Sequence, residues 1–179
     1  VDYFTIVGRG KLIVSSSMPS SPKDLEFSPM LLDQFPKPPG LSDMEVPAQL
    51  PDFCFPNGVR VLEQPVPPTY FHFVLTDFSG TALYVTCIHF YDKMDPIEVV
   101  NLFRASGTSS PIGGARMFDD NNDSDNNNNN STGGKVKQFP DWINLQDMSA
   151  NPVLYTPNCL CLISHWGFFD IFKQFLSQI

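Results

Sequence analysis

The hydrophobic pattern is clearest in the last 25 residues, Tyr155–Ile179. Cys159–Ile163 is a continuous apolar run, which is typical of a buried strand. After a hinge at 164–167 the apolar positions change to helical spacing. One stripe of the predicted helix holds Phe168, Phe172, Phe175, Leu176 and Ile179. The pattern therefore predicts a core strand that leads into an amphipathic helix, which packs back onto the sheet.

Two further strands are predicted at Tyr70–Thr76 and Ala82–Tyr91. The connection at 77–80 is short and contains glycine, which indicates an antiparallel hairpin. Both strands are apolar on both faces, so each face of the sheet needs cover. We therefore expect an α/β (α+β) fold, a three-layer sandwich in which helices flank a mainly antiparallel sheet.

The start of the chain favours a strand at Asp2–Val7, because its side chains are mostly β-branched or aromatic. Gly8 and Gly10 are expected to break this strand. A second short strand is expected at Leu12–Val14.

Regular structure is expected to be sparse in residues 15–51, which contain eight prolines. A short helix is predicted at Pro29–Phe35, with Ser28 as its N-cap and proline in its first turn. Phe53–Phe55 is predicted as a short strand that ends in a turn at 56–58.

A further helix is predicted from Asp95, its N-cap, to about Arg104. Residues 105–138 are rich in Asn, Asp, Gly and Ser, and we expect them to form a disordered insertion because they cannot bury enough apolar surface to offset backbone entropy. The acidic run 119–125 resembles a calcium loop only superficially, since Ser124 and Asn130 occupy the positions of the required Gly and Glu. Folded structure is expected to resume near Phe139.

The 179 residues are enough for one domain, and 42% of them are hydrophobic. The chain does not begin with Met, so we expect a fragment of a larger protein. No apolar run approaches 18 residues, so no transmembrane segment is predicted. The net charge of -8 argues against nucleic acid or an anionic membrane as a direct ligand.

The chain has four cysteines, Cys54, Cys87, Cys159 and Cys161. Buried, small hydrophobic side chains in a reducing compartment are the simplest interpretation. A zinc site is expected to show paired C-x-x-C sequences, whereas this chain has a single C-x-C. Cys159 and Cys161 share a strand face, and we expect no nearby His or Cys pair to complete a set of four ligands.

No residue is assigned to catalysis or cofactor binding, and no cofactor is expected. The sequence contains no G-x-S-x-G motif and no phosphate-binding glycine loop. His72 and His89 lie within strands, and His165 lies in the hinge, where a local hydrogen bond is expected. The residues therefore favour a binding module over an enzyme.

Five blocks in order along the chain resemble the upstream DENN (uDENN) module. They are Asp2–Phe4, Phe53–Gly58, Tyr70–Asp77 with Ser79–Gly80, Leu83–Cys87, and Tyr155–Phe172 with its Pro157, Cys159, Trp166 and Phe168. Gly167 stands where the family commonly has proline, which predicts a looser start of the last helix.

The resemblance implies a single longin-like domain over residues 1–179, which packs against the central DENN lobe of the same parent chain. It implies a lobe of a guanine-nucleotide exchange factor for a Rab-family GTPase, without covalent catalysis. It also implies a cytoplasmic protein recruited to vesicle or endomembrane surfaces. No position maps onto a GTPase interface, so those residues stay unassigned. The alternative is a longin-like scaffold or adaptor without exchange activity.

Overall fold

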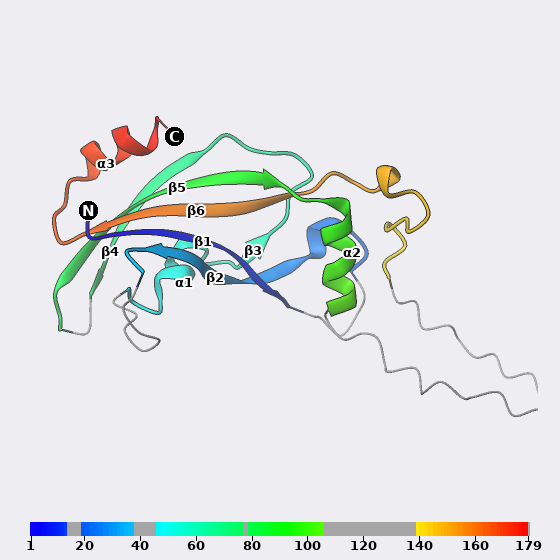
Figure 1. The fold of residues 1–179 in the computed structure, drawn as a ribbon, viewed down its shortest axis with the longest axis horizontal. Coiled ribbons are helices and arrows are strands. Elements are labelled where there is room, and N and C mark those ends of the chain that lie inside the picture. Colours follow the sequence, from blue (N-terminus) through cyan, green and yellow to red (C-terminus); the bar gives the residue numbers. More distant parts are fainter. Residues whose placement is uncertain (14–18, 38–45, 77–78, 106–138, 179) are drawn as a thin grey trace, which may run out of the picture.

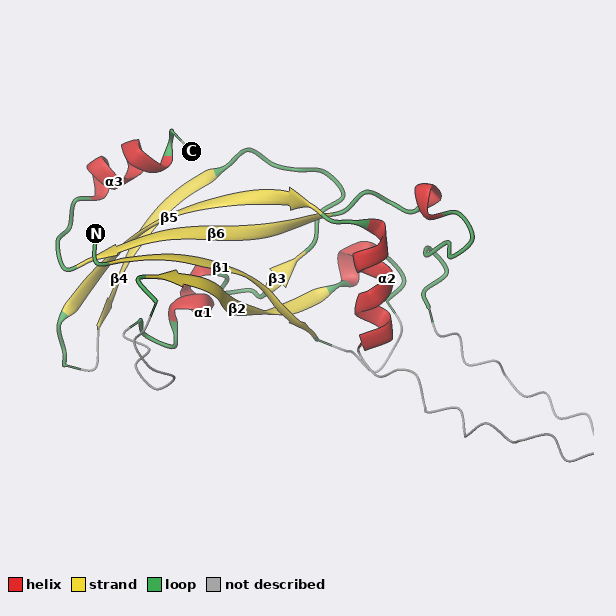
Figure 2. Ribbon diagram, in the orientation of Figure 1, coloured by secondary structure: helices red, strands yellow, loops and turns green. Residues whose placement is uncertain are grey.

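The computed structural model describes residues 1–13, 19–37, 46–76, 79–105 and 139–178. These residues form an antiparallel six-stranded sheet in the order β3-β2-β1-β6-β5-β4, accompanied by short helices. The sheet is long and curled (Figures 1 and 2). The predicted mainly antiparallel α+β class is therefore confirmed. The expected insertion lies outside the described residues from 106 onward, as does the acidic run 119–125.

The elements have the following bounds. The strands are β1 Tyr3–Leu12, β2 Glu26–Phe35, β3 Val59–Arg60, β4 Thr69–Thr76, β5 Ala82–Lys93 and β6 Tyr155–Ser164. The helices are α1 Leu50–Cys54, α2 Pro96–Ala105 and α3 Phe169–Leu176, with single 3-10 turns at Pro22–Asp24 and Met148–Ala150.

The predicted hairpin and the predicted core strand are both confirmed. β4 pairs with β5 in register from Thr69 opposite His89 to Thr76 opposite Ala82. β6 lies between β1 and β5 and is buried from Cys159 to Ser164. Both faces of this stretch are buried, one in each core cluster, which is why its side chains are almost all apolar.

Alternation along the strands divides the buried side chains into two clusters on opposite faces of the sheet. The larger cluster includes Val7, Val85 and Ile163, and it packs against Leu50 of α1. The smaller cluster contains Ile88, Leu160, Leu162, Phe172 and Leu176, and it packs under α3. Figure 1 shows α1 and α3 on opposite sides of the sheet. Both helices are short, so each covers only part of its face.

The expected break at Gly8 and Gly10 is wrong, because β1 continues through both glycines to Leu12. A Cβ atom at Gly8 would collide with the side chains of Asn158 and Leu32, and one at Gly10 would lie 2.8 Å from the carbonyl oxygen of Ser28. The glycines therefore permit a close approach between strands. The register between β1 and β2 shifts just before this stretch, between Ile6 and Val7, and again between Arg9 and Leu12. Leu12 belongs to β1, and Val14 lies outside the described residues.

The helix predicted at Pro29–Phe35 is also wrong, because these residues belong to β2, which pairs with β1. The hydroxyl of Ser28 accepts a hydrogen bond from the backbone N–H of Lys11 at 3.1 Å, so it serves the sheet and caps no helix. β3 pairs only with Glu26 and Phe27. Pro29 consequently lies where β2 forms the sheet edge, a place where its missing N–H is tolerated.

The strand predicted at Phe53–Phe55 is a helix instead, since α1 spans Leu50–Cys54. Leu50 and Cys54 are four residues apart and are both buried, which is helical spacing. Pro51 lies in the first turn, where its fixed φ suits a helix. The predicted turn follows, with Gly58 at a φ of 73°.

The predicted helix start at Asp95 is confirmed. Its Oδ1 accepts a hydrogen bond from the backbone N–H of Ile97 at 2.7 Å, and α2 then runs from Pro96 to Ala105. Glu98 of α2 forms an ion pair with Arg9 of β1. This pair connects α2 to one end of the sheet, where Figure 1 places the helix.

Candidate functional site

Four buried thiols lie together between α1 and the centre of the sheet. The Sγ atom of Cys161 lies 3.5 Å from that of Cys54, 3.3 Å from that of Cys87 and 3.6 Å from that of Cys159. All four Sγ atoms lie within 4.8 Å of one another. We call Cys54, Cys87, Cys159 and Cys161 the thiol cluster.

The expectation that no cysteine pair would complete a four-ligand set near Cys159 and Cys161 is therefore wrong. Cys87 is paired directly opposite Cys161 in the β5–β6 register. Cys54, the last residue of α1, reaches the same point from the opposite side of the core. Two of the four come from segments far away in sequence, so the missing ligands have no local spacing signature.

The thiols differ in their protonation behaviour because they share one dry site. Burial raises the pKa of Cys159 and of Cys87, which keeps both protonated. Hydrogen bonds from Cys159, Cys54 and Cys87 lower the pKa of Cys161. Cys161 is thus the central acceptor of the thiol cluster.

Two polar side chains adjoin the thiol cluster. Thr5 of β1 is paired with Cys161. Its fully buried hydroxyl makes no hydrogen bond of ordinary length and angle within the described residues, but it lies near enough to Cys161 to help lower the pKa of that thiol. The Nε2 atom of His89 in β5 lies 3.0 Å from the carbonyl oxygen of Cys54. Because a carbonyl only accepts, Nε2 carries the proton in this hydrogen bond. Burial lowers the pKa of His89, which favours the neutral ring.

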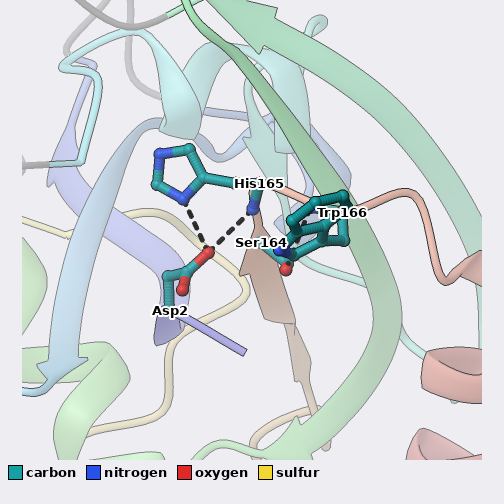
Figure 3. Close-up of polar contacts among 4 residues, drawn as sticks. All are labelled: Asp2, Ser164, His165 and Trp166. Carbon is teal, nitrogen blue, oxygen red and sulfur yellow. Dashed lines mark hydrogen bonds and ion pairs between the residues drawn. The ribbon is translucent and has the colours of Figure 1, made fainter.

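The hinge before α3 is held by Asp2 (Figure 3). Its Oδ2 accepts hydrogen bonds from the backbone N–H of His165 at 2.7 Å and from Nδ1 of the same residue at 2.8 Å. Ser164 Oγ accepts a further bond from the N–H of Trp166 at 3.2 Å. The local hydrogen-bonding role predicted for His165 is confirmed, and the partner, Asp2, directly precedes β1.

Partial burial acts to raise the pKa of Asp2, but the hydrogen bonds from His165 outweigh it, so this pKa lies below its ordinary value. The folded state therefore gains stability from the carboxylate above the unfolded pKa of about 3.9, and it loses that gain as the pH falls through the folded pKa.

We expect Asp2→Asn to lower the free energy of unfolding at pH 7 by at most about 1 kcal/mol, because the pair is partly exposed to solvent. Denaturant titration at several pH values measures this difference. If Asp2→Asn lowered the free energy of unfolding equally at pH 7 and at pH 2, the role of the ionised Asp2 would be contradicted.

The predicted apolar stripe of α3 is only partly correct. Phe172 and Leu176 are buried against the sheet, whereas Phe168 is 50% exposed and Phe175 is 54% exposed. The helix packs on the sheet along one side only. The buried part of α3 is therefore limited to the narrow face that contacts Ile88, Leu160 and Leu162. Ile179 lies outside the described residues.

The outer face of α3 is apolar and exposed. Ile171 is 61% exposed, and it lies on one helical stripe with Phe168 and Phe175. Trp166 in the adjacent hinge is 67% exposed. Large exposed side chains that gather in this way commonly mark an interaction surface.

The strand histidines take structural positions. His72 stacks on Phe169 of α3 with ring centroids 4.4 Å apart, and His89 stacks on Phe55 at 4.7 Å. Within the described segments, no hydrogen bond joins either histidine to a serine or cysteine nucleophile and a carboxylate in the manner of a catalytic triad. Among the described residues, no helix has the length and apolar character needed to cross a membrane.

The antiparallel sheet, its short helices and the buried thiol cluster together define a small α+β module. Residues 29–90 match the family model of the uDENN domain. This match confirms the resemblance drawn from the sequence motifs. It covers most of β2 and β5 and the whole of α1, β3 and β4. No solved structure gives a significant match to the chain.

Proposed function

We propose that residues 1–179 form the longin-like N-terminal lobe of a DENN-type guanine-nucleotide exchange factor for a Rab-family GTPase. In this proposal they are one domain of a longer parent chain. The uDENN match over residues 29–90 is the observation that carries the proposal. DENN proteins of this type regulate GTPases and do not catalyse covalent chemistry.

The arrangement of the motif blocks supports this assignment. Most residues of four blocks lie in strands of the same sheet, namely Tyr3–Phe4, Tyr70–Thr76, Leu83–Cys87 and Tyr155–Ser164. The helices α1 and α3 pack on its two faces, an arrangement compatible with a longin-like sandwich. The residues that resemble the family are thus scaffold, and the proposed partners contact surfaces that this scaffold presents.

The proposed mechanism is differential binding. The lobe, together with a central DENN lobe, holds the switch regions of the GTPase in a conformation that binds nucleotide poorly. Only a difference in affinity for the two GTPase conformations is required, so no nucleophile or general base takes part. In the cell the parent protein would be recruited from the cytoplasm to vesicle or endomembrane surfaces that carry its GTPase.

The test measures release of fluorescent GDP from a broad panel of Rab GTPases by the full-length parent protein. We expect the parent to accelerate GDP release from one GTPase, because its binding weakens the affinity of that GTPase for GDP, by about 5- to 150-fold for common coupling free energies. A parent protein that lacks residues 1–179 is expected to lose this effect. Unchanged release across the panel would overturn the proposal, and so would full activity of the truncated parent.

The same panel separates exchange from scaffolding. Binding to a GTPase with equal affinity for the GDP-bound and GTP-bound forms, without faster GDP release, would assign the chain to a longin-like adaptor. A nucleotide-free GTPase bound more tightly than either loaded form would support exchange, because an exchange factor must stabilise that state.

A further inference from the structure

We propose that the thiol cluster of Cys54, Cys87, Cys159 and Cys161 is a structural zinc site. This inference is independent of the proposed function in GTPase exchange. It assigns a single Zn²⁺ ion bound by four cysteine sulfurs between α1, β5 and β6.

The sulfur positions have the dimensions of a tetrahedral ligand set. A Zn–S bond of about 2.3 Å places neighbouring sulfurs of a regular tetrahedron about 3.8 Å apart. The three distances from Cys161 are 3.3, 3.5 and 3.6 Å, and no pair exceeds 4.8 Å. A disulfide needs about 2.05 Å, and all four cysteines are free. The four sulfur atoms therefore already lie close to the positions that a single bound ion requires.

The donor chemistry selects a soft metal in a closed site. Four sulfur ligands in a tetrahedron favour zinc, or iron as the competing choice. A multi-iron cluster, in which each cysteine binds a different iron, would hold the sulfurs farther apart than a single ion does. With four protein ligands and no exposure of Cys87, Cys159 or Cys161, the site has no open position for water or substrate. Its role is consequently structural.

Binding of the ion changes the charge balance of the core. Each thiol that coordinates Zn²⁺ loses its proton to solvent, so the completed site carries a net charge of about -2. The buried hydroxyl of Thr5 lies opposite Cys161 and makes no hydrogen bond of ordinary geometry among the described residues, so it is a donor available to a thiolate there. The N–H of His89 holds the carbonyl of Cys54 and thereby orients that ligand.

The position of the site explains what it stabilises. Cys54 and Cys161 are 107 residues apart, and they belong to α1 and β6. α1 has only five residues and no side-chain hydrogen bond at its N-cap. A metal bond from Cys54 to β5 and β6 therefore fixes a helix that is too short to be stable alone.

The first experiment measures the metal content of the 179-residue chain, purified under reducing conditions from zinc-supplemented cells. Native mass spectrometry and elemental analysis are expected to find one Zn²⁺ per chain, retained after exposed sites are stripped by a weak chelator. A strong chelator is expected to lower the melting temperature. Cys54→Ala is expected to lose the bound zinc and this response. Absence of stoichiometric metal from the folded wild-type chain would overturn the proposal.

Spectroscopy with Co²⁺ in place of zinc identifies the ligands. Tetrahedral sulfur coordination is expected to give intense ligand-field bands and sulfur-to-cobalt charge transfer. Bands of octahedral oxygen coordination would contradict the site. Stoichiometric iron in the purified chain would overturn the choice of zinc. Zinc retained equally by Cys54→Ala would show an adventitious ion only.

A matched pair of threonine variants tests the site without removing a ligand. Thr5→Val removes the hydroxyl opposite Cys161, and zinc affinity in competition with a chromophoric chelator is expected to fall by about 10- to 100-fold. Thr86 is equally buried and also lacks a hydroxyl partner among the described residues, but it faces away from the thiols, opposite Leu162. Thr86→Val is expected to leave the zinc affinity unchanged. Equal zinc affinity in the two variants would contradict the assigned role of Thr5.

Discussion

Replacing Phe172 with alanine is expected to lower the free energy of unfolding by about 3–5 kcal/mol. Phe172 belongs to the small cluster that joins α3 to the sheet, and its ring packs with Ile88, Leu160 and Leu162. Truncation removes apolar surface from this cluster and leaves a cavity under a helix that has few other attachments. Chemical denaturation of the 179-residue chain measures the effect.

Phe175→Ala is the matched control, because the same change is made three residues later in the same helix. Phe175 is 54% exposed, so the free energy of unfolding is expected to change by no more than about 0.5 kcal/mol. Helix propensity changes equally in the two variants, and the difference between them therefore reports burial alone. If both substitutions had equal effects, α3 would not present the face described above to the sheet.

Phe27→Ala is expected to have an effect of similar size, about 3–5 kcal/mol. The side chain of Phe27 is fully buried in the large cluster, and the guanidinium of Arg9 lies 5.1 Å from its ring centroid. The variant therefore loses core packing together with a cation–π contact. Thermal and urea unfolding of the variant and the wild-type chain provide the comparison.

Phe35→Ala is the control for this strand, since Phe35 ends β2 and is 70% exposed. It is expected to leave the stability within about 0.5 kcal/mol of wild type. If Phe35→Ala lowered the stability strongly and Phe27→Ala did not, the side of β2 that faces the core would not be the one described above.

Strong local signals led to correct predictions where they agreed with the sheet. The apolar run at Cys159–Ile163, the hairpin at 70–91 and the helix start at Asp95 all appear in the structure. At Ser28 and Pro29 a good N-cap sequence was misleading, because pairing with β1 satisfies more backbone groups than a short helix would. The spacing in α3 indicated a helix correctly, yet it did not show how narrow the covered face would be.

The thiol cluster shows the same limit at the candidate site. Cys159 and Cys161 share a face because side chains alternate along any strand, and this much was evident from their spacing. Cys87 joins them only through the β5–β6 register, and Cys54 only because its segment turns into a helix that packs on that face. A search for C-x-x-C pairs misses such a set, because its members come from three separate elements.

Local patterns in the chain establish the class of fold, the uDENN resemblance and the three strands richest in apolar residues. Those properties depend on the order and spacing of neighbouring residues, which alternation and capping rules relate directly to structure. The path of β1 through its glycines, the extended form of β2 and the meeting of four thiols depend instead on contacts between distant segments. Pairing register and packing create those contacts, and the free energy that they contribute exceeds the preferences of any single short stretch.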